Sequence, residues 1–211
     1  MSYIESTPGA WRARWLEHCP RAGRASRLAL VALSLLIFST IACSAPSPYD
    51  IEIEIDKTTR LLVVRAGEQV LKTFRVSLGR GGDGDKSRQG DKKTPIGTYR
   101  VVSFNESSKF DTFVRLNYPN VKDAYYGLRN AVISRAEFDR IVAALRLGNV
   151  PPQNTALGGA IGIHGIGEET PDKLIIHDNL DWTEGCIALR NAEIHELRPF
   201  LGLGTRVVIR E

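Results

Sequence analysis

The stretch Ile51-Glu52-Ile53-Glu54-Ile55 alternates strictly between apolar and acidic residues. Successive side chains of a β-strand point to opposite faces, so this pattern predicts a strand with one buried face and one solvated face. Residues 60–65 and 70–78 are rich in β-branched and apolar residues, and Gly67 marks a turn between them. The three segments together predict an opening antiparallel meander.

Further strands are predicted where short apolar runs lie between clusters of Gly, Pro, Asn and Ser, at residues 98–104, 160–164 and 205–209. The roughly 165 residues after the N-terminal region suit one domain with one core. We therefore expect a mainly β fold, a single β-rich domain with a few short helices.

Two helices interrupt this strand pattern. Ser134-Arg135-Ala136-Glu137 is a capping box, which predicts a helix that begins there, runs to about Leu147 and ends at Gly148. Its buried stripe is predicted to consist of Phe138, Ile141, Val142 and Leu145. Asn191 is predicted to cap a second short helix that reaches about Leu197 and carries His195 on its solvent side.

Candidate catalytic residues lie in two segments near the C-terminus, Ile161-Gly162-Ile163-His164-Gly165 and Asp181-Trp182-Thr183-Glu184-Gly185-Cys186-Ile187-Ala188-Leu189. A free thiol is mostly protonated at neutral pH, so a nucleophilic Cys186 needs an imidazole to take its proton or to stabilise the thiolate. His164, at the end of an apolar strand, is the candidate. The pair is typical of thiolate acyl transfer.

The neighbouring glycines have predicted roles in the same chemistry. Gly185 allows a sharp turn before Cys186, and the N–H groups of these two residues are candidate donors to the oxyanion of a tetrahedral intermediate. Gly165 has no side chain, so its carbonyl oxygen can approach the His164 ring and fix which nitrogen carries the proton. That carbonyl would replace the carboxylate of other catalytic triads.

The order and spacing of these motifs resemble the L,D-transpeptidase (YkuD) catalytic domain family. His164-Gly165 and Thr183-Glu184-Gly185-Cys186 fill the family signature, and Thr94-Pro95-Ile96-Gly97-Thr98-Tyr99 is similar to its Thr-Pro-x-Gly strand start. The resemblance covers residues 50–211. Asp181-Trp182-Thr183 and Cys186-Ile187-Ala188-Leu189 look most like the murein L,D-transpeptidase branch similar to YafK.

The resemblance implies a sandwich-like fold with Cys186 at one mouth and an enzyme that acts on peptidoglycan stem peptides without metal or cofactor. Cys186, His164, Gly165 and Gly185 are the implied catalytic residues, and we assign Thr183 and Arg190 to substrate binding. The acceptor stays open between a second stem peptide, a lysine of a wall-attached protein, and water, which would make the protein a hydrolase.

Other functional interpretations of the same residues stay open. Many family members have His at the position of Glu184 and Arg at that of Ala188. Because this chain lacks both residues, a non-catalytic peptidoglycan-binding module is the alternative. A carboxylate at Glu184, if unpaired, would raise the thiol pKa, and Arg190 is the nearest basic residue in sequence. His177 is the competing base, with a solvated loop or strand expected there. A zinc site is not supported by ligand spacing.

The glycine-rich stretch from Gly79 to Gly90 is a candidate phosphate-binding loop by composition. It lacks Gly-Lys-Ser/Thr and precedes a predicted strand, whereas phosphate-binding motifs precede a helix. We expect a mobile loop beside the active site instead.

Residues 1–45 are predicted to be a signal peptide or a lipoprotein leader. Five arginines precede an apolar run from Leu28 to Ala42, the order of a secretory signal, and the run is short for a membrane span. Thr40-Ile41-Ala42-Cys43 partly resembles a lipobox, so Cys43 is either lipidated or removed with the leader. The expected location is the periplasm or cell envelope, with membrane contact only through the leader or a lipid anchor.

Removal of the leader changes the charge balance. Residues 1–43 hold five Arg and two Glu, which leaves 23 basic and 22 acidic residues, a formal charge of +1. A nearly neutral domain without a basic run interleaved with aromatic residues does not indicate a nucleic-acid partner. Cys186 would then be the only thiol of an exported chain, with no partner for an internal disulfide.

Overall fold

The computed structural model describes residues 51–211, and the predicted leader with Cys43 lies outside this range. The first three strands are β1 (Ile51–Asp56), β2 (Leu61–Ala66) and β3 (Gln69–Arg75). They pair antiparallel in sequence order, so the predicted meander is confirmed. Residues 76–78 were predicted as the end of the third strand, but β3 ends at Arg75.

One mixed sheet of eight strands has the order β3-β2-β1-β8-β4-β5-β6-β7. Its other members are β4 (Gly97–Ser108), β5 (Asp111–Leu116), β6 (Gly162–His164), β7 (Ile187–Ala188) and β8 (Arg206–Arg210). Strand β8 pairs parallel with β1 and antiparallel with β4. Strands β5 and β7 were not predicted from the sequence.

The long strand β4 divides the sheet into two halves. Residues 97–100 pair with β8, whereas residues 101–108 pair with β5 across two register shifts. Shifts of this kind bend and twist a strand. The core contains apolar side chains from both halves, among them Ile53 and Leu62 on one and Val114 and Ile163 on the other. The predicted β-rich, sandwich-like domain is confirmed.

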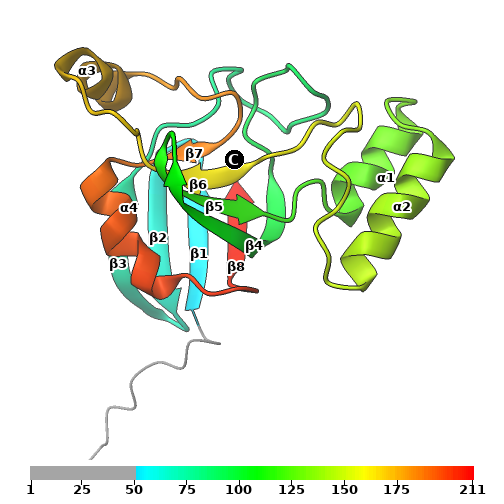
Figure 1. Cartoon of the computed structure of the whole chain (residues 1–211), viewed down its shortest axis with the longest axis horizontal. Helices are drawn as coiled ribbons and strands as arrows, with labels where there is room; N and C mark the ends of the chain where they lie inside the picture. The colour runs from blue at the N-terminus through cyan, green and yellow to red at the C-terminus, as the bar shows by residue number, and fades with distance from the viewer. Residues whose placement is uncertain (1–50) are drawn as a thin grey trace, which may run out of the picture. The chain divides into compact units, whose positions relative to one another are not determined.

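Helices α1 (Val121–Arg129) and α2 (Arg135–Arg146) lie side by side at one end of the domain (Figure 1). The predicted Ser134–Glu137 capping box begins α2, and Ile141 is buried with Phe138 and Leu145 packed around it. Helix α1 was not predicted, although Asn120 and Asp123 form a capping box there too. The two helices share a small core with Leu157, separate from the sheet.

The remaining helices are α3 (Pro171–Asn179), α4 (Asn191–Leu197) and the 3₁₀ turn η2 (Arg198–Phe200). The prediction that His177 lies in a loop or strand was wrong, because Thr170 caps α3 and Pro171 is its first residue. Asn191 was predicted as a cap but is the first residue of α4. Its side chain instead exchanges hydrogen bonds with the Gly167 backbone, at 3.1 and 2.6 Å.

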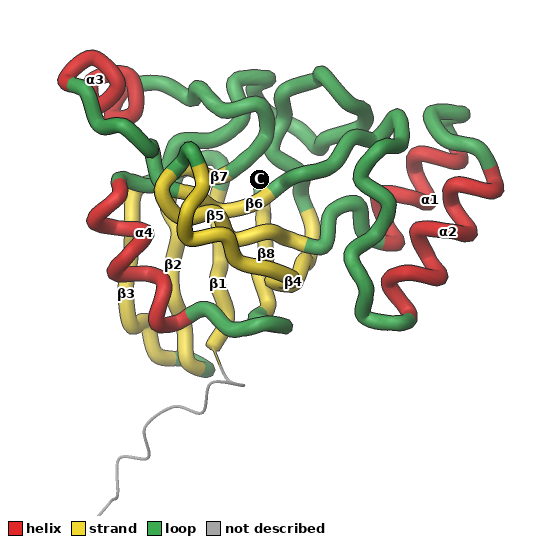
Figure 2. Tube along the Cα trace, in the orientation of Figure 1, coloured by secondary structure: helices red, strands yellow, loops and turns green. Residues whose placement is uncertain are grey.

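Figure 2 shows loops gathered at one end of the sheet, beside β6 and β7. The Arg80 N–H donates to the Thr183 carbonyl oxygen at 3.0 Å, so the glycine-rich segment runs beside the segment that leads to Cys186. That part of the loop prediction is confirmed, and its mobility stays a prediction. Within residues 51–211, no helix has both the length and the apolarity needed to cross a membrane.

Candidate active site

The turn before Cys186 is built by the Thr183 side chain. Its hydroxyl donates to the Cys186 carbonyl oxygen at 2.7 Å and accepts the Gly185 N–H at 3.1 Å. Gly185 has a φ of 129°, and a Cβ there would lie 2.7 Å from the Lys93 carbonyl oxygen. A side chain would therefore disrupt the turn, which depends on both the Thr183 hydroxyl and a glycine at 185.

Cys186 is brought to β6 by parallel pairing, with Ile163 opposite Ile187 and His164 opposite Ala188. One step earlier in this register, Cys186 lies beside Gly162, whose N–H favours the thiolate form and so acts to lower the thiol pKa. The thiol donates to the Ala160 carbonyl oxygen at 3.4 Å. Side chains two residues apart on a strand share a face, so the Cys186 and His164 side chains project from the same face of the paired strands.

The His164 imidazole is oriented by the next residue in the chain. Its Nδ1 lies 2.6 Å from the Gly165 carbonyl oxygen. A carbonyl only accepts, so Nδ1 carries the proton and Nε2 is the acceptor. A Cβ at Gly165 would lie 2.6 Å from Asn191 Oδ1 and 2.8 Å from the Phe110 carbonyl oxygen. The contact predicted between the Gly165 carbonyl and the ring is present.

Three aromatic side chains surround this ring. The ring centroids of Phe110, Phe113 and Trp182 lie 4.3, 5.9 and 5.9 Å from that of His164. Phe113 stacks with the imidazole, whereas Trp182 meets it edge to face. His164 is only 2% exposed, so its protonated form is poorly solvated.

Burial shifts both candidate groups toward their neutral forms. It raises the pKa of the Cys186 thiol to about 11, against opposing effects of the Gly162 N–H and the Lys86 charge, although Cys186 is only half-buried by solvent exposure. Burial lowers the pKa of His164 to about 4, although the Gly165 carbonyl favours its protonated form. At neutral pH the resting site therefore holds a thiol and a neutral imidazole. Such a pair suits general-base proton transfer during attack rather than a preformed thiolate.

A family model described as the L,D-transpeptidase catalytic domain (YkuD) matches residues 50–209, which include both candidate groups and all of the sheet except the last residue of β8. The chain belongs to this family. The match covers most of the predicted domain of residues 50–211.

Individual proteins that the chain resembles share only part of their length with it. The chain is 34% identical to Escherichia coli K12 YafK over 85 residues, 38% of this chain and 35% of YafK. A solved structure of the helical cell shape determining protein Pgp2 from Campylobacter jejuni has a TM-score of 0.50 and 22% identity, over 77% of this chain and 48% of Pgp2. The chain thus spans about a third of YafK and half of Pgp2, and the Pgp2 likeness supports the fold alone.

The predicted oxyanion donors of this L,D-transpeptidase domain need one correction. The Gly185 N–H is bound to the Thr183 hydroxyl, so it does not point to an oxyanion site. The Cys186 N–H makes no hydrogen bond to any other residue in the range 51–211. Gly185 thus shapes the turn, and the Cys186 amide is the remaining candidate donor.

The two residues assigned to substrate binding, Thr183 and Arg190, both make contacts within the protein. Thr183 is 3% exposed, and its hydroxyl is used within the turn. Arg190 precedes α4 and donates to Asp178 Oδ2 at 2.6 Å. It lines a cavity of about 220 Å³ with Arg75, His177, Asp178 and Glu193. The substrate-binding roles of Thr183 and Arg190 stay predictions.

Glu184, the departure from the family pattern, is exposed and paired. Its carboxylate pairs with Arg80, not with Arg190, and the side chain is 63% exposed. Arg80 lies 104 residues away in sequence, which explains why it was not identified as the partner. An exposed, paired carboxylate has a screened field, so Glu184 has little influence on Cys186.

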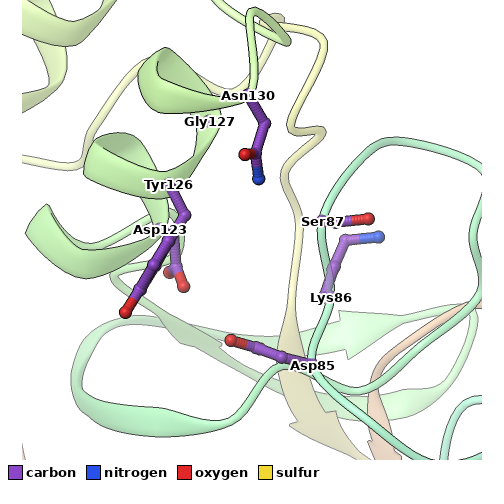
Figure 3. Close-up of a pocket in the computed structure, with 7 residues that line it drawn as sticks. All are labelled: Asp85, Lys86, Ser87, Asp123, Tyr126, Gly127 and Asn130. Atoms are coloured by element: carbon purple, nitrogen blue, oxygen red, sulfur yellow. The ribbon is translucent and has the colours of Figure 1, made fainter.

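A buried cation that no sequence pattern predicted lies in the glycine-rich segment. The Lys86 side chain is 4% exposed, pairs with Asp91 at 2.7 Å and donates to the Arg88 carbonyl oxygen at 3.0 Å. Lys86 also borders a cavity of about 240 Å³ between this segment and α1. Figure 3 shows Asp85 directed across that cavity toward Asp123.

His177, the competing base, contacts a different partner. Its Nδ1 accepts the Trp182 indole N–H at 3.3 Å, and the Trp182 ring also meets the more buried His164 edge to face. Burial lowers the pKa of His177 as well. Phe113, which stacks with His164, was also missed, since its strand β5 was not predicted.

Proposed function

We propose that this L,D-transpeptidase domain transfers an acyl group from a peptidoglycan stem peptide through a thioester on Cys186. As the sulfur attacks the carbonyl carbon of the third stem residue, His164 Nε2 takes the thiol proton. The tetrahedral intermediate collapses with cleavage of the C–N bond, and the imidazolium returns that proton to the leaving amine of the terminal D-amino acid. The Cys186 N–H is the donor to the oxyanion.

The second half of the reaction regenerates the thiol. An acceptor amine attacks the thioester carbon and loses a proton to His164, and the collapsing intermediate releases the sulfur, which recovers that proton. A second stem peptide as acceptor gives a 3–3 cross-link, and a protein lysine gives wall attachment. Water as the acceptor gives a shortened stem peptide and makes the enzyme a hydrolase.

The observation that carries this proposal is the fixed tautomer of His164. The bond of 2.6 Å from Nδ1 to the Gly165 carbonyl leaves Nε2 as acceptor, and the β6–β7 register puts the thiol and the ring on one face. Structural histidines need no such alignment with a thiol. The alternative, a non-catalytic peptidoglycan-binding module, would not require the thiol and the imidazole to lie on one face.

The cellular setting is part of the same proposal. A basic and apolar N-terminal region favours export, so we place the domain in the periplasm or cell envelope, anchored through Cys43 if that residue is lipidated. Pgp2 is described as a determinant of helical cell shape. A role in wall cross-linking or remodelling, with an effect on cell shape, fits the proposed chemistry.

Mass spectrometry of purified muropeptides after incubation with the full chain tests this function. Transfer gives a cross-linked product and a free D-amino acid, whereas hydrolysis gives the shortened monomer and the D-amino acid. Cys186→Ala should form neither, and Arg65→Gln, at the Arg65–Glu54 ion pair on β1 and β2, is the matched control that should retain activity. Unchanged muropeptides with the wild-type chain would favour the binding module instead.

A further inference from the structure

The segment that carries Cys186 begins at Asp181, a residue with no role in the chemistry above. The Asp181 carboxylate is 17% exposed and accepts hydrogen bonds from Arg60, which lies 121 residues earlier in the turn between β1 and β2. Arg60 Nη2 donates to Oδ2 at 2.8 Å and Nε donates to the same oxygen at 3.1 Å. Such a two-point contact fixes the carboxylate in orientation as well as in position.

The same carboxylate is tied to the segment after β3. Asp181 Oδ1 accepts the Leu78 N–H at 2.9 Å, and the Leu78 carbonyl oxygen accepts the Thr183 N–H at 3.0 Å. Thr183 in turn holds the Cys186 carbonyl through its hydroxyl. A continuous series of hydrogen bonds therefore leads from Arg60 through Asp181, Leu78 and Thr183 to the nucleophile.

The backbone of Arg60 gives a second, independent observation. Its φ is 56°, in the left-handed region that favours glycine. Its carbonyl oxygen accepts the Val76 N–H at 3.0 Å, a backbone bond that glycine would also make. Nothing in the backbone of this turn requires an arginine, and the side chain is used in the contact with Asp181. Residues held in such conformations tend to serve functional sites.

We propose that Arg60 is a positioning residue, which orients Asp181 and thereby the turn that presents the Cys186 thiol to His164. This inference rests on the proposed function. Arg60 touches neither candidate reacting group, so its loss should lower kcat with little effect on KM. Misplacement of a reacting group by about 1 Å can cost about a hundredfold in rate.

Arg60→Gly is the informative variant because it removes the side chain and suits the left-handed backbone. We expect its melting temperature to change by less than about 3 °C, whereas kcat for muropeptide turnover should fall at least tenfold and KM should change less than about twofold. Arg60→Lys keeps the charge but loses the two-point contact. Its kcat should therefore lie between those of the wild type and Arg60→Gly. Arg65→Gln, which removes a similar arginine–carboxylate contact at 2.8 Å, should leave kcat unchanged.

Alkylation of Cys186 by iodoacetamide gives a readout that does not depend on turnover. Burial raises the pKa of the thiol, so a loosened turn should move the alkylation pH profile of Arg60→Gly downward by about half a unit or more. The control Arg65→Gln should keep the wild-type profile.

Other outcomes separate this inference from the proposed function. Unchanged kcat and an unchanged alkylation profile in Arg60→Gly, with Cys186→Ala inactive, would overturn the positioning role alone. A rise in KM without a fall in kcat would also overturn it, because Arg60 would then contribute to substrate binding. Activity retained in Cys186→Ala would instead overturn the proposed function.

Discussion

His164→Ala should separate a general base from an ion-pair partner of the thiol. The pKa values of Cys186 and His164, about 11 and about 4, differ by about seven units, so the neutral pair dominates near pH 7. A neutral imidazole adds no charge beside the sulfur. Its removal should therefore leave the alkylation pH profile of Cys186 within about half a unit of the wild type. Turnover should nevertheless fall about a hundredfold or more.

The rate of alkylation relative to that of a free thiol follows from the same pKa values. With a thiol pKa of about 11, the thiolate fraction at pH 7 is about 10⁻⁴, against about 3% for an ordinary thiol of pKa 8.5. Cys186 should thus react with iodoacetamide about a hundredfold or more slower than a free thiol, and about tenfold faster for each pH unit up to about pH 10. Peptide mapping by mass spectrometry distinguishes Cys186 from Cys19 and Cys43.

The pH dependence of turnover has a definite sign. His164 must be neutral to accept a proton, so kcat/KM should fall as the pH drops through about 4 and should be level between about pH 6 and pH 9. An alkylation rate that is already maximal below pH 8 and becomes slow in His164→Ala would refute this reasoning. That result would show a thiolate stabilised by an imidazolium in the resting enzyme.

Three further variants test individual residues. Cys186→Ala should leave less than about 1% of the muropeptide turnover, and higher residual turnover would exclude the nucleophile role. The same change should lower the free energy of unfolding by about 1 kcal/mol or less, since the change in volume is small. His177→Ala should change the rate by less than about tenfold, because His177 contacts Trp182 and not the thiol; a larger loss than in His164→Ala would make it the base. Glu184→His should leave the alkylation pH profile within about 0.3 units, because the exposed Glu184 already pairs with Arg80; a downward shift of half a unit would show that its charge reaches Cys186.

Local patterns were sufficient to predict much of the fold. The alternation in residues 51–55 predicts β1 because one face of that strand is buried and the other is not. The Ser134–Glu137 box predicts the start of α2 because both partners lie within one helical turn. The same rules would have found α1 from Asn120 and Asp123, and α3 from Thr170 and Pro171. Strand β7 has only two residues and carries no periodic signal.

The sequence by itself determined the family of this protein and its candidate nucleophile and base, because the motifs around His164 and Cys186 are short and local. It also predicted the contact of Gly165 with the imidazole, which joins adjacent residues. Only the tertiary structure decided the partners of Glu184 and Asp181, which lie more than a hundred residues away, and the burial that shifts the two pKa values. Partner choice and desolvation depend on which distant segments pack together, and no local pattern in the chain specifies that packing.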